Sequence, residues 1–129
     1  MTPIIITYGG RTDALMYDEN DCTVRAYAVA MNKPYPIAHA IFEDFGRERK
    51  RGLEWSYLMN VFASLGIAYR YGERRGLMSF IRTHKKGTFI LALLRKGIGH
   101  AVCLRDGVLY DETDIRKARW KVLSYSEVC

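Results

Sequence analysis

The dipeptide Asp106-Gly107 constrains the fold of this 129-residue chain more than any other feature of its sequence. It separates two segments rich in β-forming residues, 100–105 and 108–111. Asp-Gly between such segments is the strongest short signal for a β-hairpin. With a two-residue loop, Arg105 pairs with Val108, and every further pair of the two strands follows from that register. The sequence therefore predicts which side chains of these strands lie close together.

Hydrophobic periodicity and chain breakers predict the remaining elements. Strands are expected at 4–8, 67–71, 88–94 and 120–125, and glycines 97 and 99 are expected to end the strand at 88–94. Helices are expected at 22–31, 36–45, 53–65 and 77–83. The helices come first and the strands of the hairpin follow. This order predicts the α+β class, with an N-terminal helical half packed on a C-terminal antiparallel sheet.

The three longer helices differ in their apolar faces. Segment 22–31 is rich in alanine and apolar almost all round, which is typical of a buried helix. Helices 36–45 and 53–65 carry narrower apolar stripes that are predicted to face inward. These are Ile37, Ile41 and Phe45 in helix 36–45, and Trp55, Leu58, Met59, Phe62 and Leu65 in helix 53–65.

Length and composition limit the class of protein. We expect one domain over residues 1–129, since this length suits a single core that needs no disulfide or metal. The three cysteines form no CxxC pair and no disulfide framework, which favours a reducing compartment. The chain has neither a signal-peptide pattern nor an apolar run long enough to span a membrane. A cytoplasmic protein is the resulting expectation.

The formal net charge is +6, and the positive residues crowd into segments 47–51 and 70–75. We interpret these segments as solvated loops and helix ends, with a surface for an acidic partner as the alternative. No RNA-binding signature accompanies the tyrosines, so nucleic acid is not the expected partner. His39 and His84 lack neighbours at metal-ligand spacing, and no cofactor motif is present, so neither a metal nor a cofactor is predicted.

Cys22 is the candidate nucleophile. It stands in the first turn of a predicted helix, after Asn20 and Asp21, where free backbone N–H groups and the helix dipole favour the thiolate. Arg25 adds positive charge three residues later. The alternative interpretation is a small buried hydrophobic residue, which is the common role of a free cysteine.

His100 and Asp111 are the candidate general base and the residue that orients it. In the predicted register Val102 faces Asp111, and His100 shares a strand face with Val102 because residues two apart point the same way. Asp111 is thus a diagonal neighbour of His100 on the same face. A bulge would bring in Glu112 instead. The alternative is a surface histidine with no catalytic partner.

The stretches NDCTVRAYAVAMNKPY, GRERKRG and GHAVCLRDGVLYD together resemble small papain-like cysteine peptidases, particularly the short versions found in bacteriophages and bacteria. The resemblance covers about residues 20–111. It implies a papain-like fold, a cysteine-dependent peptidase or isopeptidase, catalytic roles for Cys22 and His100, and an orienting role for Asp111. It also implies a protein or peptide substrate, with acidic segments as one option, and the host cytoplasm as the location if a phage encodes the chain.

The chain departs from this pattern at the oxyanion hole. Papain-like enzymes usually carry a Gln several residues before the Cys, whereas this chain has Met16 there and no Gln at all. Asn20 is the candidate replacement, because its amide can donate a hydrogen bond. Helix capping by Asn20 or Asp21 is the competing interpretation.

Two other functions stay open at this point. Cell-wall amidases of the NlpC/P60 type also use Cys and then His, but they usually have Ser-Gly after the Cys, where this chain has Thr23-Val24. An inactive papain-like scaffold that binds a partner through its basic loops is the third possibility. Cys103 should face away from His100 and be structural, and Cys129 is terminal. The oligomeric state is not predicted.

Overall fold

A mixed sheet of six strands organises the structure. The computed structural model describes residues 2–10, 20–48, 52, 55–68 and 70–128, with the backbone alone at 55–57 and 71–74. In these residues the sheet has the order β1-β5-β4-β3-β6-β2. The strands are β1 (Ile4–Ile6), β2 (Arg70–Gly76), β3 (Thr88–Arg95), β4 (Ile98–Arg105), β5 (Val108–Asp111) and β6 (Lys121–Val128). The prediction of the α+β class is confirmed.

The expectation of a purely antiparallel sheet is wrong at one edge. β1 pairs with β5 in parallel, with Ile4 opposite Leu109 and Ile6 opposite Asp111. A parallel pair needs a long connection, and here nearly the whole chain lies between the two strands. The short strand β5 therefore gains a second neighbour, and Asp111 lies between β1 and β4 rather than at an open edge.

The predicted hairpin is present in the predicted register. Arg105 is opposite Val108, and Cys103 is opposite Tyr110. Asp106 and Gly107 have positive φ angles of 50° and 81°, as a two-residue turn of this kind requires. The break expected at residues 97–99 is shorter, since Lys96 and Gly97 form the turn and β4 already begins at Ile98.

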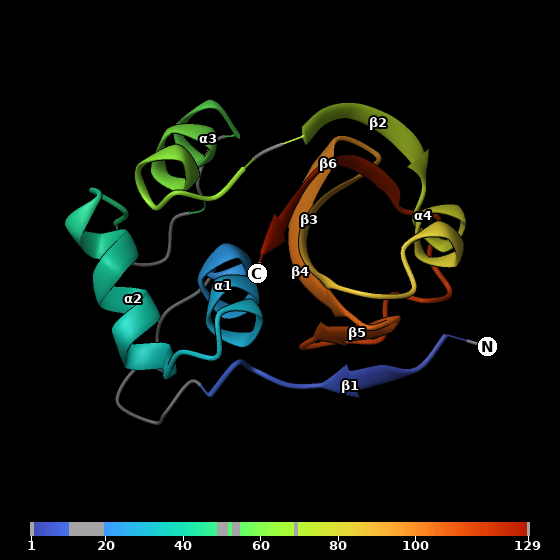
Figure 1. The fold of residues 1–129 in the computed structure, drawn as a ribbon, viewed down its shortest axis with the longest axis horizontal. Helices are drawn as coiled ribbons and strands as arrows, with labels where there is room; N and C mark the ends of the chain where they lie inside the picture. The colour runs from blue at the N-terminus through green and yellow to red at the C-terminus, as the bar shows by residue number, and fades with distance from the viewer. Residues whose placement is uncertain (1, 11–19, 49–51, 53–54, 69, 129) are drawn as a thin grey trace.

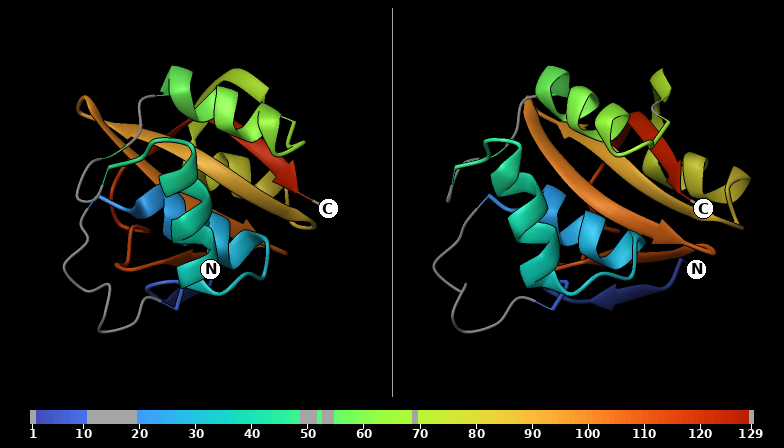
Figure 2. Two further views of the ribbon diagram at one scale, coloured as in Figure 1. Left: turned by 90° about the vertical axis from the view of Figure 1, so that its left-hand side faces the viewer. Right: turned by 60° about the vertical axis from the view of Figure 1, so that its left-hand side comes forward.

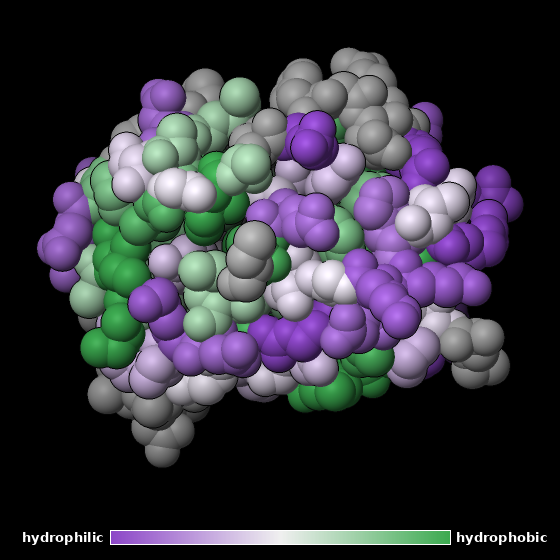
Figure 3. Space-filling model, in the orientation of Figure 1, coloured by the Kyte–Doolittle hydropathy of each residue, from purple (hydrophilic) through white to green (hydrophobic). Residues whose placement is uncertain are grey.

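The described part of the chain contains four helices, of which α2 packs on α1: α1 (Cys22–Ala30), α2 (Tyr35–Asp44), α3 (Trp55–Ser64) and α4 (Leu77–Thr83). Figure 1 shows α1, α2 and α3 on the outer side of the curved sheet and α4 at the opening between β2 and β5. The interior forms two apolar clusters, one between the helices and the sheet and one inside the curve of the sheet. Figure 3 shows apolar surface over α2 and along the lower edge over β1.

The inner faces of α2 and α3 agree in part with the predicted stripes: Ile41, Phe45 and Leu65 pack against the core, and the side chain of Trp55 lies outside the described residues. In α2, Ile37 is 51% exposed, whereas Tyr35, Ala38, His39 and Phe42 are buried. The helix is turned this way because Phe42 packs edge-on against Tyr27 of α1, with ring centroids 5.3 Å apart. In α3, Leu58 and Phe62 are buried as predicted, but Met59 is exposed and Val61 takes its place.

Segment 67–71 was expected to be a strand, but β2 begins only at Arg70. Ile67 instead completes the end of α3. Its N–H donates to the carbonyl of Phe62 at 2.8 Å, Gly66 adopts a φ of 75°, and the Ile67 side chain is buried in the helical core. This is the hydrogen-bonded helix end that glycine permits, with its apolar contact. The basic segment 70–75 consequently lies on a strand and not in a loop.

Helix α1 lies along strand β4, which Figure 2 shows from two directions. At one end Cys22 contacts the backbone of Ala101. At the other end the guanidinium of Arg105 donates to the carbonyls of Val29 and Ala30. These last carbonyls of a helix have no partner within it, and a cation there also suits the helix dipole. The strand thus positions both ends of the helix.

Candidate functional site

Cys22 is the first residue of α1, and Asp21 precedes it at the N-cap position. The thiol is half-buried and lines a pocket of about 500 Å³. Residues from four separate parts of the chain surround this pocket: Asn20, Cys22, Thr23, Arg25, Gly52, Ile98, Gly99, His100 and Glu112. The structure therefore places the predicted nucleophile at an accessible hollow rather than deep in the core.

His100 and Asp111 form a hydrogen-bonded pair, as the hairpin register predicted. Nε2 of His100 lies 2.8 Å from Oδ2 of Asp111. The Asp111 side chain is 2% exposed, and its second oxygen accepts the N–H of Glu112 at 2.8 Å. Both carboxylate oxygens are therefore held. Because Nε2 faces Asp111, Nδ1 is the ring nitrogen that is available to the Cys22 thiol.

Glu112 does not replace Asp111. The β4–β5 register has no bulge, and Oε1 of Glu112 instead accepts a hydrogen bond from Nη2 of Arg25 at 3.0 Å. Arg25 also pairs with Asp21, whose side chain is completely buried. The other oxygen of Asp21 accepts the hydroxyl of Tyr35 at 2.6 Å. Asp21 therefore makes no side-chain capping bond, contrary to one interpretation of the sequence.

Contact with His100 lowers the pKa of Cys22 below its ordinary value of 9.0. Burial is the largest single effect and opposes ionisation of the thiol. The hydrogen bond and positive charge of His100, the backbone of Ala101 and the charge of Arg25 together outweigh it. The thiolate is thus favoured by the neighbours that the fold brings to the start of α1.

The same contacts raise the pKa of His100 to about 9. Burial is again the largest single effect and on its own would lower the value. It is outweighed by the hydrogen bonds to Asp111 and Cys22 and by the negative charges of both. A lowered cysteine pKa beside a raised histidine pKa favours a thiolate–imidazolium pair at neutral pH.

Trp120 covers the imidazole and was not identified from the sequence. Its ring centroid lies 5.6 Å from that of His100, at an interplanar angle of 37°. The same tryptophan packs against the apolar cluster inside the sheet. Trp120 stands just before β6, and β6 is separated from β4 by β3. The sequence around Trp120 therefore does not predict its contact with His100. The hydrogen bond between Asp21 and Tyr35 was missed for the same reason, whereas Arg25 follows Asp21 by four residues, a spacing that favours a charge pair at a helix start.

Asn20 also lines the pocket, next to Cys22. Its side chain is exposed and its backbone has a φ of 53°, a left-handed conformation that asparagine tolerates better than most residues. Asn20 is therefore placed at the same hollow as the thiol. Met16 lies outside the described residues.

Among the described residues of the basic segments 47–51 and 70–75, none lines the pocket at Cys22. Arg47 is buried, which contradicts a solvated loop, and residues 49–51 lie outside the described part of the chain, as does the side chain of Arg74. Arg70 is exposed on β2. Arg75 packs over the ring of Phe80 and donates to Thr83.

Cys103 behaves as predicted. It is fully buried among apolar side chains on the helical side of the sheet, whereas its strand neighbours Val102 and Leu104 face the other cluster. Burial raises its pKa to about 12. Cys103 is therefore an unreactive thiol within the same molecule as Cys22. Cys129 lies outside the described residues.

The remaining histidines have structural contacts. His84 stacks on Phe80 with ring centroids 3.8 Å apart, and buried His39 packs against Tyr35. Across the described residues no group of three or more His, Cys, Asp or Glu side chains is arranged to hold a metal ion. None of the helices in that part of the chain combines the length and hydropathy needed to cross a membrane.

No protein-family model, curated protein or solved structure matches the chain.

Proposed function

We propose that the chain is a cysteine-dependent hydrolase of the papain-like type, a peptidase or isopeptidase that acts through Cys22, His100 and Asp111. The observation that carries the proposal is the linked arrangement of these three side chains. A thiol at a helix start contacts a histidine, and the histidine's far nitrogen binds a buried carboxylate at 2.8 Å. This is the nucleophile–base–orienter geometry that covalent catalysis by cysteine requires.

In the proposed reaction the Cys22 thiolate attacks the carbonyl carbon of an amide bond. The tetrahedral oxyanion receives hydrogen bonds from the backbone N–H of Cys22 and from the amide of Asn20. Collapse of this intermediate breaks the C–N bond, and the imidazolium of His100 gives its proton to the leaving amine. His100 then accepts a proton from water, which hydrolyses the thioester and releases the thiol.

The carbonyl must reach Cys22 through the pocket that Asn20, Gly99 and His100 line. Gly99 lacks a side chain beside the imidazole, so substrate backbone can approach closely there. Arg25 and Glu112 also line this pocket but bind each other, so they present a balanced pair of charges to the substrate. An uncharged peptide backbone suits such a pocket.

Alkylation of the cysteines tests the nucleophile. The protein is treated with iodoacetamide at about pH 6, where an ordinary thiol is almost entirely protonated, and the modified residues are located by mass spectrometry. Cys22 should be labelled quickly, and Cys103 should remain unmodified as an internal control. His100→Ala should slow labelling of Cys22 about ten-fold or more. Equal slow labelling of both cysteines would reject the proposal.

Turnover provides the second test. Fluorogenic peptides and peptidoglycan fragments are offered to the wild type and to Cys22→Ala, a change that removes little buried volume. Cleavage of peptides by the wild type alone supports the peptidase. Cleavage of peptidoglycan fragments alone would instead indicate a cell-wall amidase with the same three residues. A reactive Cys22 without any turnover would contradict the hydrolase.

A further inference from the structure

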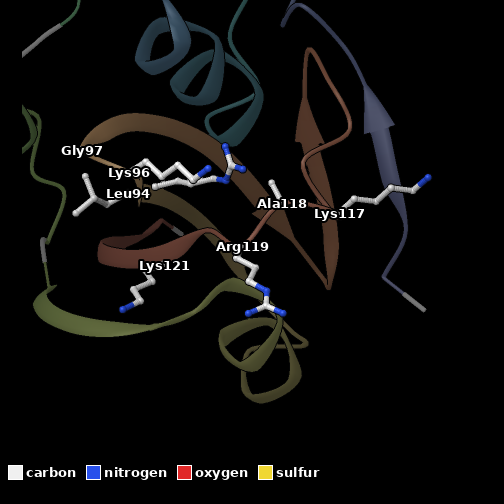
Figure 4. A pocket seen from close by; sticks show the side chains of 8 residues that line it. Leu94, Lys96, Gly97, Lys117, Ala118, Arg119 and Lys121 are labelled. Carbon is white, nitrogen blue, oxygen red and sulfur yellow. The ribbon is translucent and has the colours of Figure 1, made fainter.

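A second pocket, of about 610 Å³, lies between the β3–β4 turn and the segment that leads into β6. Five of the eight residues that line it are positively charged, and none is acidic: Leu94, Arg95, Lys96, Gly97, Lys117, Ala118, Arg119 and Lys121. Figure 4 shows Lys96 extending from the turn towards Ala118, whereas the side chains of Arg119 and Lys121 point away from Lys96. We refer to this hollow as the basic pocket.

The positive charges of the basic pocket are not neutralised by the protein in the described part of the chain. The nearest acid on the same segment, Asp114, is engaged by Arg116 at 2.6 Å. Lys96, Lys117, Arg119 and Lys121 are exposed, and none of them forms an ion pair with a described carboxylate. Like charges gathered without counter-charges raise the local potential and favour an anionic ligand.

The basic pocket adjoins the candidate active site. Arg95 is paired across the hairpin with Ile98, and Leu94 with Gly99, and both Ile98 and Gly99 line the Cys22 pocket. Paired residues on neighbouring strands lie about 5 Å apart. On the other side, Arg119 and Lys121 flank Trp120, whose ring packs against His100. The two pockets therefore lie next to one another at the β3–β4 turn, with Lys96 and Gly97 lining one and Ile98 and Gly99 lining the other.

We propose that the basic pocket binds an acidic segment of the polypeptide whose amide bond is cleaved at Cys22. This inference rests on the proposed function and names the substrate class of the same site. Because the two pockets meet at the β3–β4 turn, Asp or Glu side chains near the cleaved bond of an extended peptide would reach the basic pocket. Arg95, Lys96, Arg119 and Lys121 would pair with their carboxylates.

The lining favours an acidic peptide over a nucleic acid. Single-stranded nucleic acids are usually held by aromatic faces on which bases stack, in addition to positive charge. The basic pocket has no aromatic lining residue, and the neighbouring Trp120 already packs its ring against His100. The carboxylates of a flexible peptide can be bound by positively charged side chains alone, and the basic pocket provides these.

Binding of fluorescein-labelled octaglutamate, followed by fluorescence anisotropy at low salt, tests the proposal. The measurements use the full chain carrying Cys22→Ala, so that no labelled peptide is consumed. The double variant Lys96→Gln/Lys121→Gln should weaken binding about five-fold or more, since it removes two exposed positive charges that would each pair with a carboxylate. The matched control, Lys85→Gln/Lys86→Gln, removes two equally exposed lysines next to the start of β3, roughly 25 Å away along that strand, and should change affinity less than two-fold.

Three outcomes would overturn the proposal: no binding of octaglutamate, equal weakening by both double variants, or tighter binding of a labelled deoxythymidine 20-mer that the same lysines control. The second outcome would indicate non-specific attraction to the net charge, and the third a nucleic-acid site. Because binding is measured without Cys22, a failure here is independent of the labelling result for that cysteine. Rapid labelling of Cys22 combined with failed peptide binding would leave the hydrolase in place and remove only its acidic subsite.

Discussion

His100 and Asp111 are joined by a hydrogen bond of 2.8 Å that crosses from β4 to β5, and the carboxylate in it is 2% exposed. A buried carboxylate at this distance both orients the imidazole and stabilises its charged form. The pKa of His100 is accordingly raised to about 9 even though burial acts against the charge. Asp111 therefore bears on the pKa of Cys22 through His100, which contacts both side chains.

Replacing Asp111 with Asn should test this dependence. The amide can still hydrogen-bond to His100, but it lacks the negative charge, so the pKa of His100 should fall and that of Cys22 should rise. We expect the rate of Cys22 alkylation at about pH 6 to drop about ten-fold for each unit by which the cysteine pKa rises. His100→Ala should reduce the rate further, because it removes the cation itself.

Glu112→Gln is the matched control for Asp111→Asn. It makes the same acid-to-amide change one residue away, on a side chain that binds Arg25 rather than His100. Its effect on alkylation should be small. If both variants react like the wild type, Asp111 has no orienting role. If Glu112→Gln has the larger effect, the assignment of the two acids is reversed.

The two carboxylates that hold Arg25 should differ in their effect on stability. Asp21 is completely buried and also binds Tyr35, whereas the Glu112 side chain is 32% exposed. Asp21→Ala leaves a buried cation without its nearest partner, which typically costs about 3 to 5 kcal/mol. Glu112→Ala breaks a partly solvated pair and should cost at most about 1 kcal/mol. Urea unfolding measures both, and similar losses would show that the Asp21–Arg25 pair is not effectively buried.

The hairpin explains why part of the site could be predicted from the sequence. Asp106-Gly107 determines the turn, the turn determines the register, and the register makes His100 and Asp111 neighbours on one face. Each step is local and follows from backbone geometry. The start of α1 at Cys22 and the bounds of α4 were likewise predictable, because caps, breakers and periodicity act within a few residues.

The remaining features depend on contacts between distant segments. Cys22 reaches His100 only because α1 lies along β4, where Arg105 holds the other end of the helix. The parallel pairing of β1, the rotation of α2 and the position of Trp120 over His100 arise in the same way. Asp21 is a separate case, because one of its two partners, Arg25, is only four residues away. Its position favoured a helix cap, but buried Arg25 and Tyr35 are stronger partners than a backbone N–H.

Trp120 offers a test of how the imidazole is held. Its Nε1 is buried and has no hydrogen-bond partner among the described residues, and an unsatisfied buried donor is destabilising by about 1 to 3 kcal/mol. Trp120→Phe keeps a ring beside His100 and removes this donor, so stability should change little. Trp120→Ala should lose about 3 kcal/mol or more. In nuclear magnetic resonance spectra the His100 ring proton bound to Asp111 should stay visible in the first variant and exchange too fast to observe in the second. Equal losses for both variants would contradict this role of the ring.

The pH dependence of alkylation should show two steps at Cys22. The pKa of the thiol is lowered from 9.0, so the rate should first rise below pH 9, when the thiolate forms beside protonated His100. It should rise again near pH 9, where His100 loses its proton and the thiolate is no longer paired with a cation.

Hydrolysis of a peptide substrate needs both the thiolate and the protonated imidazole, so its rate should instead fall above about pH 9 and give a bell-shaped profile. In His100→Ala the two alkylation steps should merge into one at a higher pH than the first step of the wild type, since burial is then opposed only by Arg25 and the backbone of Ala101. A single step at the ordinary value in the wild type would mean that Cys22 and His100 do not form an ion pair, and the proposed mechanism would lose its nucleophile.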